Sequence, residues 1–272
     1  MGEAMSQLNY MITGNDLQYI HITLEPGQEA IAEQGAMMYV DKNITINTIL
    51  GDGAPSRLGG IGRFFNAIKR SFTGESMFST VYKNTASKPQ AIAIAAPSPG
   101  EIIPINLSEH GGTIICQKGA YIAGELGQRI QLAFQKRLRV GFFGGEGFIM
   151  QKISGQGIVF VHASGTLKEV TLNPDDELKI DTGCLVGMSS TVRYDIKYTG
   201  KLKNSLFGGE GLFYATVSGP GKVWIQSLPM NRLSKILMTA ALTGNSSRSS
   251  WMGKFYLLAV ILAAISILAT KQ

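Results

Sequence analysis

Apolar and polar residues alternate in three short segments that stand near the start of three stretches of the chain. The segments are residues 22–24, 105–107 and 170–172, and Pro-Gly at 26–27 or Pro-Asp at 174–175 follows two of them. A period of two is typical of a strand with one buried face, and these dipeptides are typical of turns. The pattern therefore predicts three units that each open with a strand and a turn.

Glycine-rich turns also separate pairs of apolar segments later in the chain. Residues 154–157 (Ser-Gly-Gln-Gly) lead into the apolar residues 158–161, and residues 218–221 (Ser-Gly-Pro-Gly) lead into 223–225. Two strand-like segments around such a turn predict a β-hairpin. We therefore expect a hairpin at each of these two positions.

One short phrase occurs three times, at residues 72–78, 143–149 and 207–213. The last two copies start 64 residues apart (207 − 143), and an upstream Gly-Ala or Gly-Cys pair repeats at the same step, from 119 to 183. A fixed period indicates internal duplication. The first copy has 13 extra residues after its own Gly-Ala pair (72 − 35 = 37, against 24 in the others), which predicts an inserted loop over 51–63.

These elements favour an all-β fold of three repeated β-sandwich-like units, over about residues 8–100, 101–165 and 166–229. Units of about 64 residues bury too little surface to be stable alone, so we expect one body over 1–240. Apolar residues at helical spacing predict short helical connections over 64–70 and 130–138, and a short helix over 229–240.

The C-terminal residues 255–270 contain no charged side chain, and a polar linker over 241–254 precedes them. A 16-residue helix spans about 24 Å, close to the roughly 30 Å hydrocarbon core of a bilayer. The sequence therefore predicts a C-terminal transmembrane helix that acts as a tail anchor. Nine strongly apolar residues make up this anchor: Phe255, Leu257, Leu258, Val260, Ile261, Leu262, Ile265, Ile267 and Leu268.

Basic residues flank the predicted anchor unequally, because Arg232, Lys235, Arg248 and Lys254 precede it and Lys271 alone follows it. The positive-inside rule then predicts a single-pass membrane protein whose β body faces the cytoplasm. A buried helix packed on the β body is the alternative. A segment that is apolar on every face favours the membrane.

The chain offers little recognisable chemistry. Its three histidines, His21, His110 and His162, lie far apart, and no nucleophile elbow, phosphate loop or dinucleotide fingerprint occurs. We therefore expect no enzyme, metal or cofactor. Cys184 stands where the sister units carry alanine (Ala120 in the second), which indicates a small buried residue rather than a disulfide partner.

Each copy of the repeated phrase carries a Gly-Glu pair, and these pairs are the candidate structural residues Gly74, Glu75, Gly145, Glu146, Gly209 and Glu210. A carboxylate after glycine can accept backbone N–H groups in a turn where the glycine adopts positive φ. A structural role is the first interpretation. The alternative is that three carboxylates converge near a pseudo-threefold axis on a cation or a basic partner group.

The net charge is +6, with basic clusters at residues 69–70 and 136–139. Such clusters suit a solvated face, contact with anionic lipid, or attraction to nucleic acid. Sheets that bind nucleic acid usually interleave exposed aromatic and basic residues, and this pattern is missing. Nucleic acid is therefore the less favoured partner.

Five phrases in order, at residues 24–28, 35–37, 73–76, 143–147 and 224–229, resemble the family named for altered inheritance of mitochondria. This family is grouped with proteins similar to the tryptophan RNA-binding attenuation protein. Over about residues 8–240, the resemblance implies three β-sandwich-like units with pseudo-threefold symmetry, often assembled into homo-oligomers. It also implies, from the mitochondrial members, a link to inner-membrane organisation, and it assigns no functional residue.

Together these observations predict a non-enzymatic, membrane-tethered scaffold or interaction protein. The expected partners are membrane lipid and either another protein or a second copy of the chain. A nucleic-acid-binding module is the competing hypothesis, favoured by the basic charge.

Overall fold

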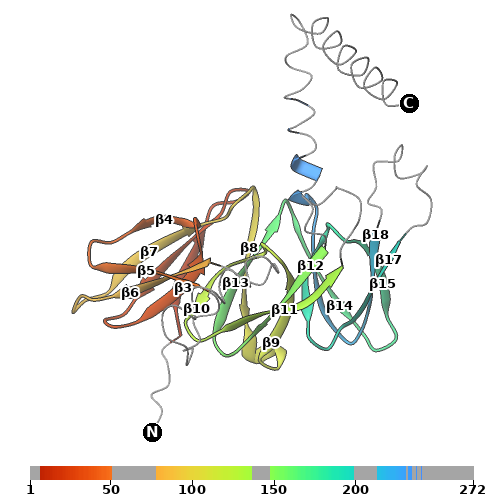
Figure 1. Ribbon diagram of the computed structural model, residues 1–272, viewed down its shortest axis with the longest axis horizontal. Coiled ribbons are helices and arrows are strands. Elements are labelled where there is room, and N and C mark those ends of the chain that lie inside the picture. The colour runs from red at the N-terminus through yellow and green to blue at the C-terminus, as the bar shows by residue number, and fades with distance from the viewer. Residues whose placement is uncertain are drawn as a thin grey trace, which may run out of the picture. The chain divides into compact units, whose positions relative to one another are not determined.

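The computed structural model describes residues 7–50, 78–136, 148–198 and 213–230, together with 232–234, 237 and 240 (Figure 1). It confirms the all-β class, since the described residues up to 229 form nineteen strands and one 3₁₀ helix, η1 (Leu107–His110). The chain divides into two compact units, Met1–Pro229 and Met230–Gln272. No helix among the described residues is long and apolar enough to cross a bilayer. The predicted anchor over 255–270 lies outside them.

Only six residues of the second unit are described, namely 230, 232–234, 237 and 240, and all six are helical. They lie where the sequence predicts a short helix over 229–240. The inserted loop over 51–63 and the predicted helical connection over 64–70 lie outside the described residues.

The strands of the first unit follow one another in three runs of six. After β1 (Asn9–Thr13), the first run is β2 (Tyr19–Leu24), β3 (Glu29–Glu33), β4 (Met37–Val40), β5 (Ile44–Leu50), β6 (Phe78–Asn84) and β7 (Gln90–Ala95). The second run is β8 (Gly100–Asn106), β9 (Thr113–Gln117), β10 (Tyr121–Glu125), β11 (Arg129–Lys136), β12 (Phe148–Ser154) and β13 (Ile158–Ser164). The third run is β14 (Leu167–Leu172), β15 (Glu177–Asp181), β16 (Leu185–Ser189), β17 (Arg193–Tyr198), β18 (Phe213–Ser218) and β19 (Gly221–Gln226).

Strand pairing follows the same antiparallel scheme in each run. In the first run, β2 and β4 flank β7, and β3 and β5 flank β6. In the second run, β8 and β10 flank β13, and β9 and β11 flank β12. In the third run, β14 and β16 flank β19, and β15 and β17 flank β18. Each run therefore supplies two groups of three strands. The predicted strands at 22–24 and 170–172 belong to the first strand of their run, and that at 105–107 covers the end of β8 and the first residue of η1.

Two pairings join successive runs into continuous sheets, and we call them joints. The pair β3–β10 makes the six-stranded sheet β5-β6-β3-β10-β13-β8, and the pair β9–β16 makes the six-stranded sheet β11-β12-β9-β16-β19-β14. Two shorter sheets remain, β1-β2-β7-β4 and β15-β18-β17. The shorter sheets end in β4 and β15, which are not paired with each other.

One strand at each joint, β10 or β16, is buried on both faces. Every residue of β10 is buried, because Ile122 packs into the core of the first run and Tyr121 into the core of the second. In β16, Val186 likewise points into one apolar core and Met188 into the next. Strands covered on both faces lose the apolar–polar alternation that marks a half-exposed strand. This is why these two segments read as continuous apolar runs.

The two predicted hairpins are wrong. The turn over 154–157 connects β12 to β13, and the turn over 218–221 connects β18 to β19, but the two strands of each pair lie in different sheets. The chain reverses at these glycines while it passes from one layer to the other, so flanking strands pack across a core instead of sharing hydrogen bonds. A glycine-rich turn indicates that the chain reverses direction, but it does not indicate whether the next strand returns in the same sheet or in the facing one.

The predicted helical connection over 130–138 is also wrong, because residues 129–136 form β11, which pairs with β12. Ile130 and Phe134 pack against two apolar cores, while Leu132 between them is 38% exposed. Apolar residues at 130, 132 and 134 satisfy the period of a strand as well as that of a helix. Pairing with β12 decides between them.

Gly157 allows a buried carboxylate to approach the turn between β12 and β13. Its φ is +78°, and a Cβ atom built there would collide with the Glu125 carboxylate, which accepts the Ile158 N–H at 3.1 Å. Gly27 has nearly the same φ, +80°, with nothing within 4 Å of such a Cβ. Substituting each glycine therefore distinguishes the cost of backbone strain, expected at both, from the cost of collision with Glu125, expected at Gly157 alone.

We expect Gly27→Ala to lower the free energy of unfolding by about 1 kcal/mol, the cost of a left-handed alanine. Gly157→Ala should cost about 1–3 kcal/mol more, because displacing Glu125 leaves a buried N–H without its acceptor. Urea titrations of both variants test this. Equal losses at the two glycines would show that the carboxylate does not support the turn.

Candidate functional site

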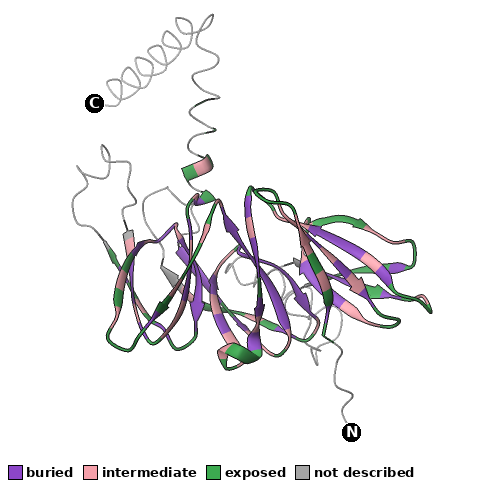
Figure 2. Cartoon of the chain, turned by 180° about the vertical axis from the view of Figure 1, so that it is seen from behind, coloured by how far each residue is buried: buried purple, intermediate pink, exposed green. Residues whose placement is uncertain are grey.

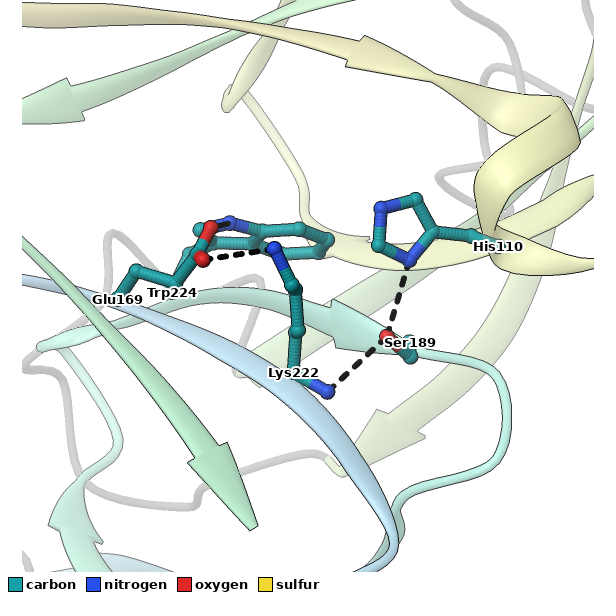
Figure 3. A network of polar contacts seen from close by, with 5 residues as sticks. All are labelled: His110, Glu169, Ser189, Lys222 and Trp224. Carbon is teal, nitrogen blue, oxygen red and sulfur yellow. Dashed lines mark hydrogen bonds and ion pairs between the residues drawn. The ribbon is translucent and has the colours of Figure 1, made fainter.

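A polar cluster lies where the second run meets the third (Figure 3). We call it the joint cluster, and it consists of His110 from η1, Glu169 from β14, Ser189 from β16, and Lys222 and Trp224 from β19. It stands beside the β9–β16 joint, because Ser189 pairs with Ile114 of β9. The local fold brings residues from two repeats together.

Glu169 is held by two donors from the neighbouring strand. The Lys222 ammonium donates to Oε1 at 2.8 Å and the Trp224 indole N–H donates to Oε2 at 2.9 Å. Glu169 lies directly opposite Trp224 in the β14–β19 pair. Lys222 and Trp224 are two residues apart on β19, so their side chains project on the same face of the sheet. The hydrogen bond from Lys222, followed by that from Trp224, lowers the pKa of Glu169 against the opposing effect of partial burial. Both carboxylate oxygens are therefore occupied.

His110 contacts Ser189 and Trp224. Its Nδ1 lies 3.1 Å from the Ser189 Oγ, and its ring meets the Trp224 ring edge-on with centroids 5.3 Å apart. Ser189 Oγ also accepts the Lys222 main-chain N–H at 3.1 Å. Burial, and then the positive charge of Lys222, lowers the pKa of His110. The neutral imidazole is therefore favoured.

The serine–histidine contact does not form a catalytic triad among the described residues. A triad needs a carboxylate that orients the imidazole through its second nitrogen. The nearby carboxylate, Glu169, is engaged by Lys222 and Trp224 instead. The contacts thus tie η1 of the second run to three strands of the third.

A hydrogen bond from a backbone N–H to a side-chain oxygen recurs at the same place in all three runs. Asp41 Oδ2 accepts the Ala91 N–H at 2.7 Å, Glu125 Oε1 accepts the Ile158 N–H at 3.1 Å, and Ser189 accepts the N–H of Lys222. Each acceptor stands at or just after the end of the third strand of its run. Each donor lies at or near the start of the sixth strand. The side chain differs each time, so no repeated sequence phrase reveals it.

The candidate residues of the repeated phrase, Gly74, Glu75, Gly145, Glu146, Gly209 and Glu210, lie outside the described residues. Their structural or cation-binding role stays a prediction. Within the described ranges, no three His, Cys, Asp or Glu side chains are grouped as metal ligands would be. His21, His110 and His162 lie on β2, η1 and β13. Cys116 is buried and Cys184 is half-buried, and the two are not disulfide-bonded.

An exposed apolar strand edge is the second candidate site. Met37, Met38 and Tyr39 of β4 are 44%, 56% and 41% exposed, and the strand is green along most of its length in Figure 2. The equivalent strands, β10 and β16, are buried at every residue. The difference follows from the joints, since β10 pairs with β3 and β16 with β9, whereas β4 pairs with β7 alone.

One face of the same sheet continues this exposed surface. Met11, His21, Ala93 and Tyr39 oppose one another across four strands, although Ala93 itself is fully buried. The His21 Nδ1 lies 2.9 Å from the Tyr39 hydroxyl, and Met11 is 59% exposed. The unpaired edge and this row form one surface of mixed apolar and polar character, which suits contact with another protein.

The pairing scheme and its joints define a class: a β protein built from three sandwich-like runs that share continuous sheets. The sequence matches the mitochondrial biogenesis AIM24 family over residues 10–228, so the chain belongs to this family. This confirms the resemblance to the family named for altered inheritance of mitochondria.

Two streptococcal proteins are similar to the chain. An uncharacterised protein of Streptococcus pyogenes serotype M6 is 30% identical over 220 residues, which cover 80% of this chain and 84% of that protein. The crystal structure of a Streptococcus pyogenes protein aligns with a TM-score of 0.67 and 28% identity, covering 86% of this chain and 99% of that one.

The joint cluster gives a pH prediction. Because the pKa of Glu169 is lower in the folded protein than in the unfolded chain, its stabilising effect is present above the unfolded pKa, about 4.3 for glutamate, and is lost as pH falls through the folded value. Glu169→Gln should therefore lower stability at pH 7 by about 0.5 kcal/mol, the size expected of a half-exposed ion pair.

Thermal melts of both proteins between pH 3 and pH 7 measure this difference. The gap in melting temperature should close as the solution becomes more acid. A gap that is the same at pH 3 and pH 7 would contradict the assigned role of the carboxylate.

Proposed function

We propose that the β body is a protein-interaction scaffold, held at the cytoplasmic face of a membrane by residues 255–270. The observation that carries this proposal is the exposed edge of β4, where Met37, Met38 and Tyr39 face solvent beside unpaired backbone groups. An open strand edge offers main-chain hydrogen bonds, and exposed apolar side chains add burial. Both favour docking of another polypeptide.

The joints support a scaffold role, because they make the three runs mechanically continuous. Sheets that cross from run to run hold each run at a fixed angle to the next. At one such joint, His110 of the second run contacts Ser189 and Trp224 of the third. The pseudo-threefold symmetry that the family resemblance implies stays a prediction. The family's link to mitochondrial biogenesis supports a role in membrane organisation.

The membrane tether is argued from the sequence of the tail. Nine strongly apolar side chains at roughly −0.3 to −0.6 kcal/mol each give about −3 to −5 kcal/mol toward insertion. No charged residue between 255 and 270 opposes this. Basic residues before the segment favour a cytoplasmic β body.

Ile261→Arg should release the full-length protein from membranes. An arginine near the helix centre costs about 3 kcal/mol and removes the isoleucine, which nearly cancels the driving force. Ile261→Leu is the matched control and should stay in the membrane. Carbonate extraction of cell membranes, followed by blotting of pellet and supernatant, separates the two outcomes. If the parent protein is extracted as readily as Ile261→Arg, the tether is wrong.

The competing hypothesis, nucleic-acid binding, is supported by the net charge of +6. Nonspecific phosphate attraction weakens steeply with added salt. For the full-length protein in detergent, we expect at most weak RNA binding, falling at least tenfold between about 50 and 200 mM salt. Filter-binding titrations test this. Sequence-selective binding that persists at the higher salt would favour the competing hypothesis.

A further inference from the structure

We infer that the outer face of the sheet β1-β2-β7-β4 binds a soft monovalent metal ion, Cu(I), through the side chains of Met11 and His21. Tyr39 is the positioning residue of this site, because its hydroxyl holds the His21 ring. The site would add metal binding to the proposed scaffold role, and it does not depend on the membrane tether.

Strand pairing brings the two ligands together. Met11 of β1 lies directly opposite His21 of β2 in their antiparallel pair. Opposed residues project from the same face of a sheet, with Cβ atoms about 4.5–5.5 Å apart. That face is the outer one, because Tyr10 and Ile12, the neighbours of Met11, pack against the apolar core. A thioether and an imidazole therefore stand side by side on the surface.

Tyr39 fixes the orientation of the His21 ring. Its hydroxyl lies 2.9 Å from His21 Nδ1, and Ala93, which stands between the two residues across the sheet, is fully buried. A metal-binding histidine typically uses one ring nitrogen for the metal and hydrogen-bonds the other, which sets the tautomer. Nε2 of His21 has no hydrogen-bond partner among the described residues. It lies on the other side of the ring from Nδ1, so it turns away from Tyr39 and toward the β1 side, where Met11 lies.

The chemistry of the two ligands selects the metal. Thioether sulfur is a soft ligand that favours Cu(I), and imidazole also binds copper. The carboxylates that favour Mg²⁺, Ca²⁺ and Mn²⁺ are missing, because the described strands β1, β2 and β7 contain no charged residue. Two protein ligands also leave coordination positions open, as at exchangeable rather than structural metal sites.

The pair is peculiar to the first run. β1 lies outside the strand scheme that the three runs share, so the repeat does not require Met11. In the third run Glu169 takes the place of His21, because it opposes Trp224 as His21 opposes Ala93. Met11 is 59% exposed and adds little to the core. A ligand role accounts for an exposed thioether in front of an oriented imidazole.

The sequence alone predicts no metal at this place. Met11 and His21 stand ten positions apart (21 − 11) in no metal-ligand motif, and the pairing of β1 with β2 reveals them. The lack of grouped His, Cys, Asp and Glu side chains within the described ranges does not bear on the site, because one of its two ligands is a methionine sulfur.

Chelator competition measures the affinity. Full-length protein in detergent is titrated with Cu(I), which ascorbate keeps reduced and bathocuproine disulfonate buffers as a coloured complex. Every protein carries Cys184→Ala, which removes the half-buried thiol and places alanine where the second run has Ala120. Cys116 can stay, because burial raises the pKa of its thiol to about 12.

We expect binding of Cu(I) by the parent and much weaker binding without either ligand. Loss of an outer partner alone costs about 10–100-fold in metal affinity, so Met11→Leu and His21→Gln should each cost at least about tenfold. Met38→Leu is the matched control and should bind like the parent, because Met38 is an exposed methionine of the same sheet outside the site. Binding by Met11→Leu as tight as that by Met38→Leu would overturn the inference.

Tyr39→Phe tests the positioning role. It removes the hydroxyl and keeps both ligands, so the affinity should fall about tenfold. X-ray absorption of the loaded variant should still show a sulfur and a nitrogen neighbour at the copper, whereas loaded Met11→Leu should lack the sulfur. A sulfur neighbour that survives Met11→Leu, or unchanged affinity in Tyr39→Phe, would contradict the inferred geometry.

Melting curves keep folding and binding apart. Met11 is exposed, so metal-free Met11→Leu should melt at the temperature of the parent. Cu(I) should raise the melting temperature of the parent but not that of Met11→Leu, because an ion that binds only the folded chain stabilises it. Equal shifts in the two proteins would show that the ion binds elsewhere and would overturn the inference.

Discussion

Antiparallel pairing between strands of successive runs is the interaction on which the rest of this structure depends. A single run has too few residues to bury a large core, and the joints β3–β10 and β9–β16 let neighbouring runs share sheets. Sharing buries β10 and β16 on both faces and links three apolar cores. In the joint cluster, His110 of the second run contacts Ser189 and Trp224 of the third and so adds side-chain contacts at one of these connections.

The same constraint determines what the molecule presents to its surroundings. A joint needs a third strand from one run and a second strand from the run before it. A chain of three runs has two complete joints and one unmatched strand of each kind. The exposed methionines and tyrosine of β4 are therefore a consequence of the repeat, and a scaffold that recruits protein through this edge uses a feature the fold already has.

The sequence predicted the elements better than their connections. The alternation at 22–24, 105–107 and 170–172 located strands, because local periodicity reflects one buried face. The turns over 154–157 and 218–221 misled, because glycine permits a reversal in either direction. The apolar residues 130, 132 and 134 fit the period of a helix as well as that of a strand, and only pairing with β12 makes this segment a strand. The joint cluster escaped prediction because His110 and Glu169 belong to different repeats, and because Asp41, Glu125 and Ser189 perform one task with three side chains.

Hydrogen exchange of backbone amides tests the central claim, that strand pairing between successive runs holds the β body together, most directly. For the full-length protein in detergent, amides of β10 and β16 should exchange slowly at every protein concentration, because their joints lie within the chain. Amides on the open edges of β4 and β15 should exchange much faster, because these edges have no described strand beside them. Exchange in β10 and β16 as rapid as at these open edges would contradict the account.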